Sequence, residues 1–362
     1  MTIHVLEFKD INYMEVVMNI LTKQIGIVTA FVLGGAIAAD AEALDWPSYG
    51  EDREFMRVDG GIERNDGLTN ALPDVVGPVD GSASLTIFTE GNHYPVLLPL
   101  VLDEFVAWCE TEERCAVSRE DILVVTLPQV MIMQGFASGG FRFGNAQLPV
   151  APDTPVYPDL VMLGSGPMGR LAGQDLLAEP PRTFARHLGM GMLVRREAAA
   201  EVSDLEAFAG SELPFVMATP RETGARMQYV ETLSALLGTE TANTVLARET
   251  GDFPGRLAIQ HRDVPYAVMN DIAPVGLLFG HLSRFYAEHW SEDLVFVEVP
   301  EAASFGREIA VAPTRRNDGA DPELVGAFLD FLLDAAPDAY VEGGFADAST
   351  FGFGEEMSLA SD

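Results

Sequence analysis

The chain has 362 residues, of which 48% are hydrophobic, so it is long enough to bury a sizeable core in two lobes of ordinary size. Its formal net charge is -33 at pH 7, which argues against nucleic acid as a partner. We interpret the excess of carboxylates as a solubility or salt-adaptation feature, although it also repels free anions at long range.

Residues 1–41 are predicted to be a signal peptide. A segment with the positive charge of Lys23 precedes the stretch 25–39, which is apolar and holds no charged residue. About fifteen apolar residues are fewer than the roughly twenty that cross a bilayer, so we expect export rather than an anchor. The small residues that follow predict cleavage after Ala41 or Ala43. Acidic residues ahead of this segment make Met18 our preferred initiator.

The two cysteines, Cys109 and Cys115, are separated by a short polar stretch. Export permits a disulfide, and we predict one between them. Two inert thiols are the alternative. The spacing fits neither a metal site of the CxxC kind nor a redox pair.

Residues 42–82 are rich in Gly, Asp, Pro and Asn, and we predict an irregular N-terminal extension there. From Ser84 onward strands and helices alternate, which predicts an α/β fold with mostly parallel strand pairing. The predicted strands are 85–88, 122–127, 160–163, 190–194, 215–217, 276–279, 294–299 and 309–312, and the clearest predicted helices are 95–108, 225–237 and 322–333.

Two glycine-rich segments, 135–140 and 164–169, superficially look like nucleotide-binding loops. Neither has the spacing of a dinucleotide or phosphate loop, so we interpret them as turn or helix-packing glycines. A serine elbow, an HExxH pair, and a cysteine with a base are also missing from the sequence. We therefore expect no enzyme activity and no cofactor.

The most specific signal is the helical pattern 327–333 followed by 339–345, which ends in Gly344 and Phe345. This ending resembles the terminal helix and GF turn of the molybdate-type solute-binding proteins of ABC importers. The segment 306–312 resembles the strand by which such chains return from the second lobe to the first. The resemblance extends from about Ser84 to Phe345.

The resemblance implies a periplasmic binding protein type II-like fold, in which two α/β lobes are joined by crossing hinge strands. Lobe 1 would comprise 83–186 and 308–355, and lobe 2 would comprise 187–307. The ligand would lie between the lobes, at strand ends and helix N-termini that favour oxyanions. The protein would be periplasmic and monomeric, with an ABC permease as its membrane partner.

Five loops are implied to contact the ligand, and they contribute Asn92, His93, Gln129, Thr223, Gly224, His261, Arg262 and Phe279. Phe279 stands where the family has a tyrosine, which removes a hydroxyl donor, and Glu90 adds an acceptor. His93 and His261, one from each lobe, are expected to lie within reach of one ligand.

The resulting hypothesis is capture of a small ligand, an oxyanion such as molybdate or tungstate, for uptake by an ABC transporter. The alternative is a sensor or accessory module on the same fold, with a metal or a small organic ligand. Glu90, His93 and His261 could form a three-ligand metal site in that case, although we expect no resident metal.

Overall fold

The computed structural model describes residues 74–111, 114–143, 146–149, 157–220, 222–250, 261–315 and 321–357. The predicted signal peptide, its cleavage sites and most of the predicted extension lie outside the described residues. Among the described residues, no helix is both long enough and apolar enough to span a membrane.

The first sheet has six strands in the order β1-β3-β2-β6-β12-β7. They are β1 (Asp74–Val76), β2 (Leu85–Glu90), β3 (Ile122–Leu127), β6 (Leu160–Gly164), β7 (Arg182–Arg186) and β12 (Glu308–Pro313). β2 pairs in parallel with both β3 and β6, whereas β1 and β12 add antiparallel neighbours. The carboxyl ends of β2, β3 and β6 therefore lie at one edge of this sheet.

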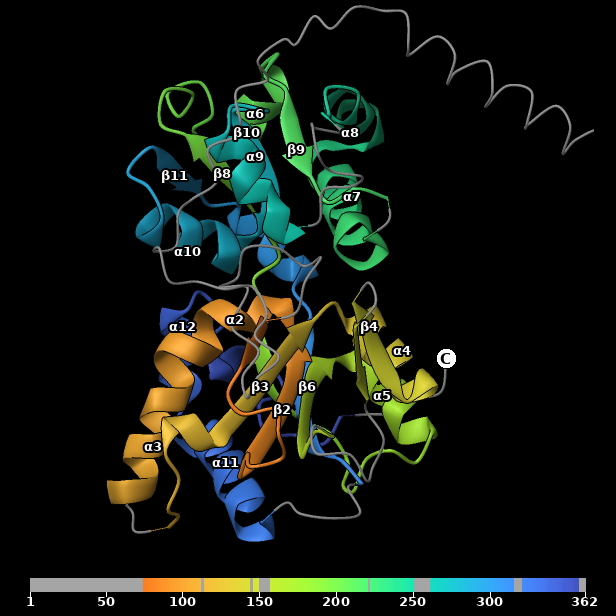
Figure 1. Ribbon diagram of the computed structural model, residues 1–362. Coiled ribbons are helices and arrows are strands. Elements are labelled where there is room, and N and C mark those ends of the chain that lie inside the picture. The colour runs from red at the N-terminus through yellow and green to blue at the C-terminus, as the bar shows by residue number, and fades with distance from the viewer. Residues whose placement is uncertain are drawn as a thin grey trace, which may run out of the picture. The chain divides into compact units, whose positions relative to one another are not determined.

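Helices cover both faces of the six-stranded sheet, because successive strand side chains point to opposite faces. Ile87, Val124 and Met162 belong to one buried cluster, which includes α3 (Leu102–Thr111), α11 (Pro322–Asp334) and α12 (Pro337–Glu342). Their strand neighbours belong to a second cluster with α4 (Gln129–Ser138) and α5 (Ser165–Gly173). Figure 1 shows α3 and α11 beside one face, and α4 and α5 beside the other.

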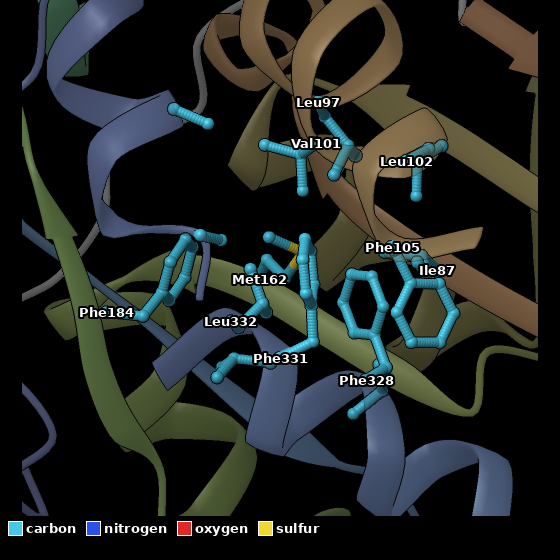
Figure 2. Packing of buried hydrophobic residues seen from close by; sticks show 14 of the residues in the cluster. Ile87, Leu97, Val101, Leu102, Phe105, Met162, Phe184, Phe328, Phe331 and Leu332 are labelled. Carbon is cyan, nitrogen blue, oxygen red and sulfur yellow. The ribbon is translucent and has the colours of Figure 1, made fainter. Parts of the chain in front are cut away.

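Phenylalanine rings form the centre of the first cluster. The ring of Phe105 in α3 lies 4.9 Å from that of Phe328 and 5.4 Å from that of Phe331, both in α11. Figure 2 shows these rings facing Met162 and Ile87 of the sheet. Burial of this apolar surface explains why the helical pattern at 322–333 was recognisable from the sequence.

The second sheet has four strands in the order β11-β8-β10-β9. They are β8 (Met190–Arg195), β9 (Phe215–Met217), β10 (Val275–Phe279) and β11 (Leu294–Val297). The associated helices are α6 (Leu205–Gly210), α7 (Thr223–Leu237), α8 (Thr239–Leu246), α9 (Val264–Met269) and α10 (Gly280–His289). β9 and β10 pair in parallel, whereas β8 pairs antiparallel with both β10 and β11.

Two segments connect the sheets, and they run side by side. One follows β7 and the other precedes β12, and the amide of His187 donates to the carbonyl of Arg307 at 3.2 Å. The predicted architecture of two α/β lobes joined by crossing strands is thereby confirmed. The lobe boundaries after residues 186 and 307 stay a proposal.

The structure corrects three predictions of local structure. Residues 74–76 form β1 rather than an irregular extension, and a strand of three residues is too short to show periodicity. Strand pairing is predominantly antiparallel, since β12 returns from the second sheet against the direction of β6 and β7. The helix predicted at 95–108 is divided, because a π-helix at Leu97–Val101 precedes α3.

The two glycine-rich segments also have a structure that the sequence did not specify. The segment 135–140 spans the end of α4 and the start of a hairpin of β4 (Gly140–Phe143) and β5 (Ala146–Pro149). Gly139 ends α4 with a φ of 71°, a left-handed conformation that glycine adopts easily. The segment 164–169 begins α5.

The predicted disulfide between Cys109 and Cys115 is confirmed. Cys109 lies in α3, and the two Cα atoms are 4.9 Å apart. The amide of Arg114 donates to the carbonyl of Cys109 at 3.2 Å, which closes the same short loop.

Gly189 lies in the segment that follows β7, and we expect this position to tolerate no side chain. Its φ is 80°, and a Cβ would lie 2.1 Å from the carbonyl oxygen of Ala302. We expect Gly189→Ala to lower the free energy of unfolding by about 1–3 kcal/mol, through backbone strain and displacement of the second connection.

Gly326 offers the matched control for this substitution. It lies in α11, and a Cβ there would have no neighbour within 4 Å. Gly326→Ala is expected to stabilise by about 0.5–1 kcal/mol, because alanine favours the helix. Urea unfolding of both variants checks the pair, and equal effects would show that the connection is not tightly packed.

Candidate ligand-binding site

Helices begin where the parallel strands of both sheets end. In the first sheet α4 begins two residues after β3, and α5 follows β6 directly. In the second sheet α10 follows β10 directly, and α7 begins after β9. In each of these four helices, the N-cap side chain accepts no hydrogen bond from a first-turn amide of the described chain. Helix N-termini with these properties favour a negatively charged ligand.

Glu90, the last residue of β2, is a buried carboxyl group with 3% of its surface exposed. Its Oε2 accepts a hydrogen bond from Gln129 Nε2 at the start of α4, and its Oε1 accepts one from Asn92 Nδ2 at 3.4 Å. Burial raises the pKa of Glu90 to about 7, although Asn92, His261 and Arg307 oppose this shift. Glu90 is therefore poised to gain or lose a proton near neutral pH.

Asn92 has a fixed orientation, because its Nδ2 faces the Glu90 carboxyl. Its Oδ1 is buried and has no hydrogen-bond partner among the described residues. A buried acceptor without a partner is energetically costly, so this oxygen is available to a donor that a ligand supplies.

His93 is fully buried in lobe 1, and its hydrogen bonds determine its tautomer. The Thr89 hydroxyl donates to the Met162 carbonyl at 3.0 Å, so its oxygen must accept from His93 Nδ1, which lies 2.5 Å away. Burial lowers the pKa of His93 to about 3, with a smaller contribution from His187. The ring is therefore neutral, with its lone pair on Nε2, and it packs beside Phe184, Tyr340 and Phe345.

The second sheet contributes His261 and Phe279. The His261 backbone amide donates to Glu222 Oε2 at 2.5 Å, and its Nδ1 contacts the other oxygen of the same carboxylate. The Phe279 ring lies 5.5 Å from the His261 ring, at the start of α10. The positive potential of His261 lowers the pKa of Glu90, in opposition to the larger effect of burial.

Two further histidines, His187 and His281, complete this arrangement. The His187 ring is 4.7 Å from Phe279 and 6.2 Å from His281, and the His281 ring is 4.4 Å from Phe345. Burial lowers the pKa of His187 to about 3 and that of His281 well below its ordinary value. We call the group of Glu90, Asn92, Gln129, His187, His261, Phe279 and His281 the interlobe site.

The structure thus brings five of the eight sequence-predicted residues, namely Asn92, His93, Gln129, His261 and Phe279, to the interlobe site or its immediate edge. His93 is at that edge, since Phe345 lies 6.0 Å from the His93 ring and 4.4 Å from the His281 ring. No ring contact joins His93 directly to His261 among the described residues.

The other three predicted residues differ in their surroundings. Arg262 is buried in an ion pair with Asp74 of β1, at 2.6 Å, so its guanidinium serves a contact within the protein. Thr223 and Gly224 form the first turn of α7, where Gly224 is exposed. The backbone amides of this turn are groups that could donate to a ligand.

Sequence reasoning missed His187, Glu222 and His281. His281 stands two residues after Phe279, at the N-terminus of a helix that follows a strand, and that position could have indicated it. His187 and Glu222 carried no such signal. Among the described residues, no group of three His, Cys, Asp or Glu side chains is arranged to hold a metal ion, so the metal site considered for Glu90, His93 and His261 is not formed.

Comparison with known proteins identifies the family. The sequence profile described as "Bacterial extracellular solute-binding protein" matches residues 150–346, which is more than half of the chain. No protein of curated function matches the sequence.

Several solved structures are similar in fold. The sulfate-binding protein SubI from Mycobacterium tuberculosis H37Rv has a TM-score of 0.50 at 13% identity, covering 74% of this chain and 88% of that chain. A periplasmic thiamin binding protein has a TM-score of 0.49 at 12% identity, covering 74% and 82%. The periplasmic molybdate-binding protein of Azotobacter vinelandii has a TM-score of 0.48 at 13% identity, covering 72% and 98%.

Identities this low relate the proteins by fold and leave the ligand open. The two sheets, the paired connections and the profile match agree with one another. The chain belongs to the bacterial extracellular solute-binding protein family, whose members are extracytoplasmic binding components of ABC importers rather than enzymes.

Proposed function

We propose that the chain captures a small oxyanion at the interlobe site and delivers it to an ABC permease. Molybdate and tungstate are the oxyanions that the resemblance of the C-terminal third implies. Asn92, His93, Gln129, Thr223, Gly224, His261, Arg262 and Phe279 are the residues that we assign to ligand capture, although the guanidinium of Arg262 is paired with Asp74 and leaves its backbone to the ligand.

The observation that carries this proposal is the set of four helix starts, at α4, α5, α7 and α10, at the carboxyl ends of parallel strands. None has a side-chain cap, so their first-turn amides retain the capacity to donate to an anion. The side-chain amides of Asn92 and Gln129 and the neutral ring of His187 add further hydrogen-bonding groups without adding charge.

A thermal-shift panel tests the proposal. Molybdate, tungstate, sulfate, phosphate, divalent metals and small organic acids would each be added to the purified protein. Binding stabilises the folded state by about 2.7 kcal/mol when the ligand is at a hundredfold excess over its Kd. We expect at least one oxyanion to raise the melting temperature, and a response to metals or organic acids alone would reject the proposal.

Gln129→Ala is expected to weaken oxyanion binding by about 1 kcal/mol, since it removes an amide at the start of α4. Gln174→Ala is the matched control, because Gln174 is exposed at the end of α5. Titration calorimetry on both variants measures the difference. Equal affinities would remove Gln129 from the site.

A further inference from the structure

Glu90 conflicts with a simple anion-binding role for the interlobe site. Its carboxyl group is buried and accepts hydrogen bonds from the side-chain amides of Gln129 and Asn92. A carboxylate and an oxyanion that share a dry site repel each other strongly. Either the anion does not bind there, or one of the two negative groups must be neutralised.

The charged groups around Glu90 do not supply that neutralisation. Arg307 and His261 act on it electrostatically, but His261 already contacts the Glu222 carboxylate through Nδ1 and its backbone amide. His93, three residues along, is neutral because burial lowers its pKa to about 3. The effect of burial exceeds that of Arg307 and His261, so the pKa of Glu90 is raised to about 7.

The hydrogen bonds around Glu90 also indicate that a proton is needed there when an oxyanion binds. Each carboxyl oxygen already receives one amide N–H, from Asn92 and from Gln129. The nearby Asn92 Oδ1 is a buried acceptor without a partner among the described residues. The ionised Glu90 carboxylate and Asn92 Oδ1 are therefore both acceptors. An oxyanion that carries no hydrogen also has only acceptors, so it could form no hydrogen bond with either group. A single added proton converts Glu90 from an acceptor to a donor.

We propose that the interlobe site binds its oxyanion together with one proton, which Glu90 and the ligand share. The proton comes from solution when the ligand is a dianion without a proton, such as molybdate. It arrives with the ligand when the oxyanion already carries one, as monohydrogen phosphate does. Glu90 is on this basis the residue that determines which protonation state of an oxyanion is captured. The inference rests on the proposed function.

Titration calorimetry with molybdate and with inorganic phosphate, at pH values between about 6 and 8, tests this proposal. Repeating each titration in two buffers of different ionisation enthalpy measures the protons taken up. For molybdate we expect proton uptake that is small near pH 6, where free Glu90 is already protonated, and that approaches one proton near pH 8, with an affinity that falls up to about tenfold for each pH unit above the pKa of Glu90. For phosphate we expect uptake close to zero near pH 8, where monohydrogen phosphate supplies the shared proton, and proton release near pH 6, where free Glu90 and dihydrogen phosphate carry additional protons.

Glu90→Gln keeps the size of the side chain but removes the titrating group. We expect this variant to bind molybdate with less than a twofold change in affinity between pH 7 and pH 8, and without proton uptake. Glu231→Gln is the matched control, since Glu231 is exposed on α7 and should retain the wild-type pH dependence.

The outcomes separate the two proposals. Suppose that the wild type binds molybdate or phosphate without the expected proton uptake or release, and that Glu90→Gln has the same pH dependence as the wild type. The proposal of a shared proton is then wrong, but the proposal of oxyanion capture stands. If the wild type binds no oxyanion at any pH, both proposals are wrong.

Discussion

Lowering the pH from 7 to 5 is expected to destabilise the protein by about 2–4 kcal/mol, because buried neutral histidines must be protonated when the chain unfolds. The pKa values of His93 and His187 are lowered by burial from 6.5 to about 3. Over this pH range the unfolded state therefore binds protons that the folded state does not, which costs about 2 kcal/mol for each histidine at pH 5. His281, whose pKa is also lowered, adds in the same direction.

Glu90 opposes this trend. Its pKa is raised from 4.5 to about 7, so the folded state binds the extra proton between these values. Stability from Glu90 is complete below pH 4.5 and is lost as the pH rises through 7, an effect of about 3 kcal/mol in all, of which about 2 kcal/mol falls between pH 5 and 7. Between pH 7 and 5 the stability gained from Glu90 cancels the stability lost from about one histidine. The free energy of unfolding still falls over this range, because more than one histidine is buried and neutral.

Urea unfolding at several pH values measures this slope. His187→Gln should reduce the loss of stability between pH 7 and 5 by the contribution of one histidine, about 2 kcal/mol. His289→Gln is the control, because His289 is exposed. A free energy of unfolding that stays constant or rises between pH 7 and 5 would show that these histidines are not held neutral.

The strands of the two sheets were largely predictable, because their apolar runs are buried on both faces. Leu160–Gly164 has helices over both faces, and its hydrophobic pattern is correspondingly continuous. β1 was not predictable, since its three residues carry no period and its Asp74 is an unusual residue for a buried strand. The pairing direction of β12 depends on the return from the second sheet, which no local pattern encodes.

The loops that bind the ligand stay a prediction, whereas the chemistry around Glu90 could not be predicted from the sequence. Asn92, His93 and Phe279 were placed by resemblance, and each lies at or beside the interlobe site. His187 and His281 are 94 residues apart in the sequence, as their numbers show, and become neighbours through the crossing of the chain between the sheets. The altered pKa of Glu90 arises from burial, which depends on tertiary structure and leaves no mark in the sequence.

Replacing Arg262 with methionine is expected to lower the free energy of unfolding by about 3–5 kcal/mol, the cost of leaving one partner of a buried ion pair without the other. Arg262 Nη1 and Nη2 donate to the two oxygens of Asp74 at 2.6 and 3.1 Å, and the two side chains are 1% and 0% exposed. The guanidinium also lies over the Tyr94 ring, with its Cζ 5.3 Å from the centroid.

This ion pair joins β1 of the first sheet to the helical turn before α9, on the second sheet. The ion pair therefore helps to hold the two lobes together. Arg114→Met is the control, because Arg114 pairs with Asp330 where both side chains are about half exposed, and such pairs contribute less than about 1 kcal/mol.

The double variant Arg262→Met with Asp74→Leu distinguishes the loss of attraction from the cost of an uncompensated charge. If the buried carboxylate of Asp74 causes the loss in Arg262→Met, then removing it should restore much of the stability, because apolar side chains can replace a buried ion pair at little net cost. Thr126 limits the recovery, since its hydroxyl donates to Asp74 and would lose that acceptor. Urea unfolding of the two single variants and the double variant completes the cycle. An Arg262→Met protein within about 1 kcal/mol of the wild type would show that Asp74 is solvated or protonated when Arg262 is absent, and that the ion pair does not hold the lobes.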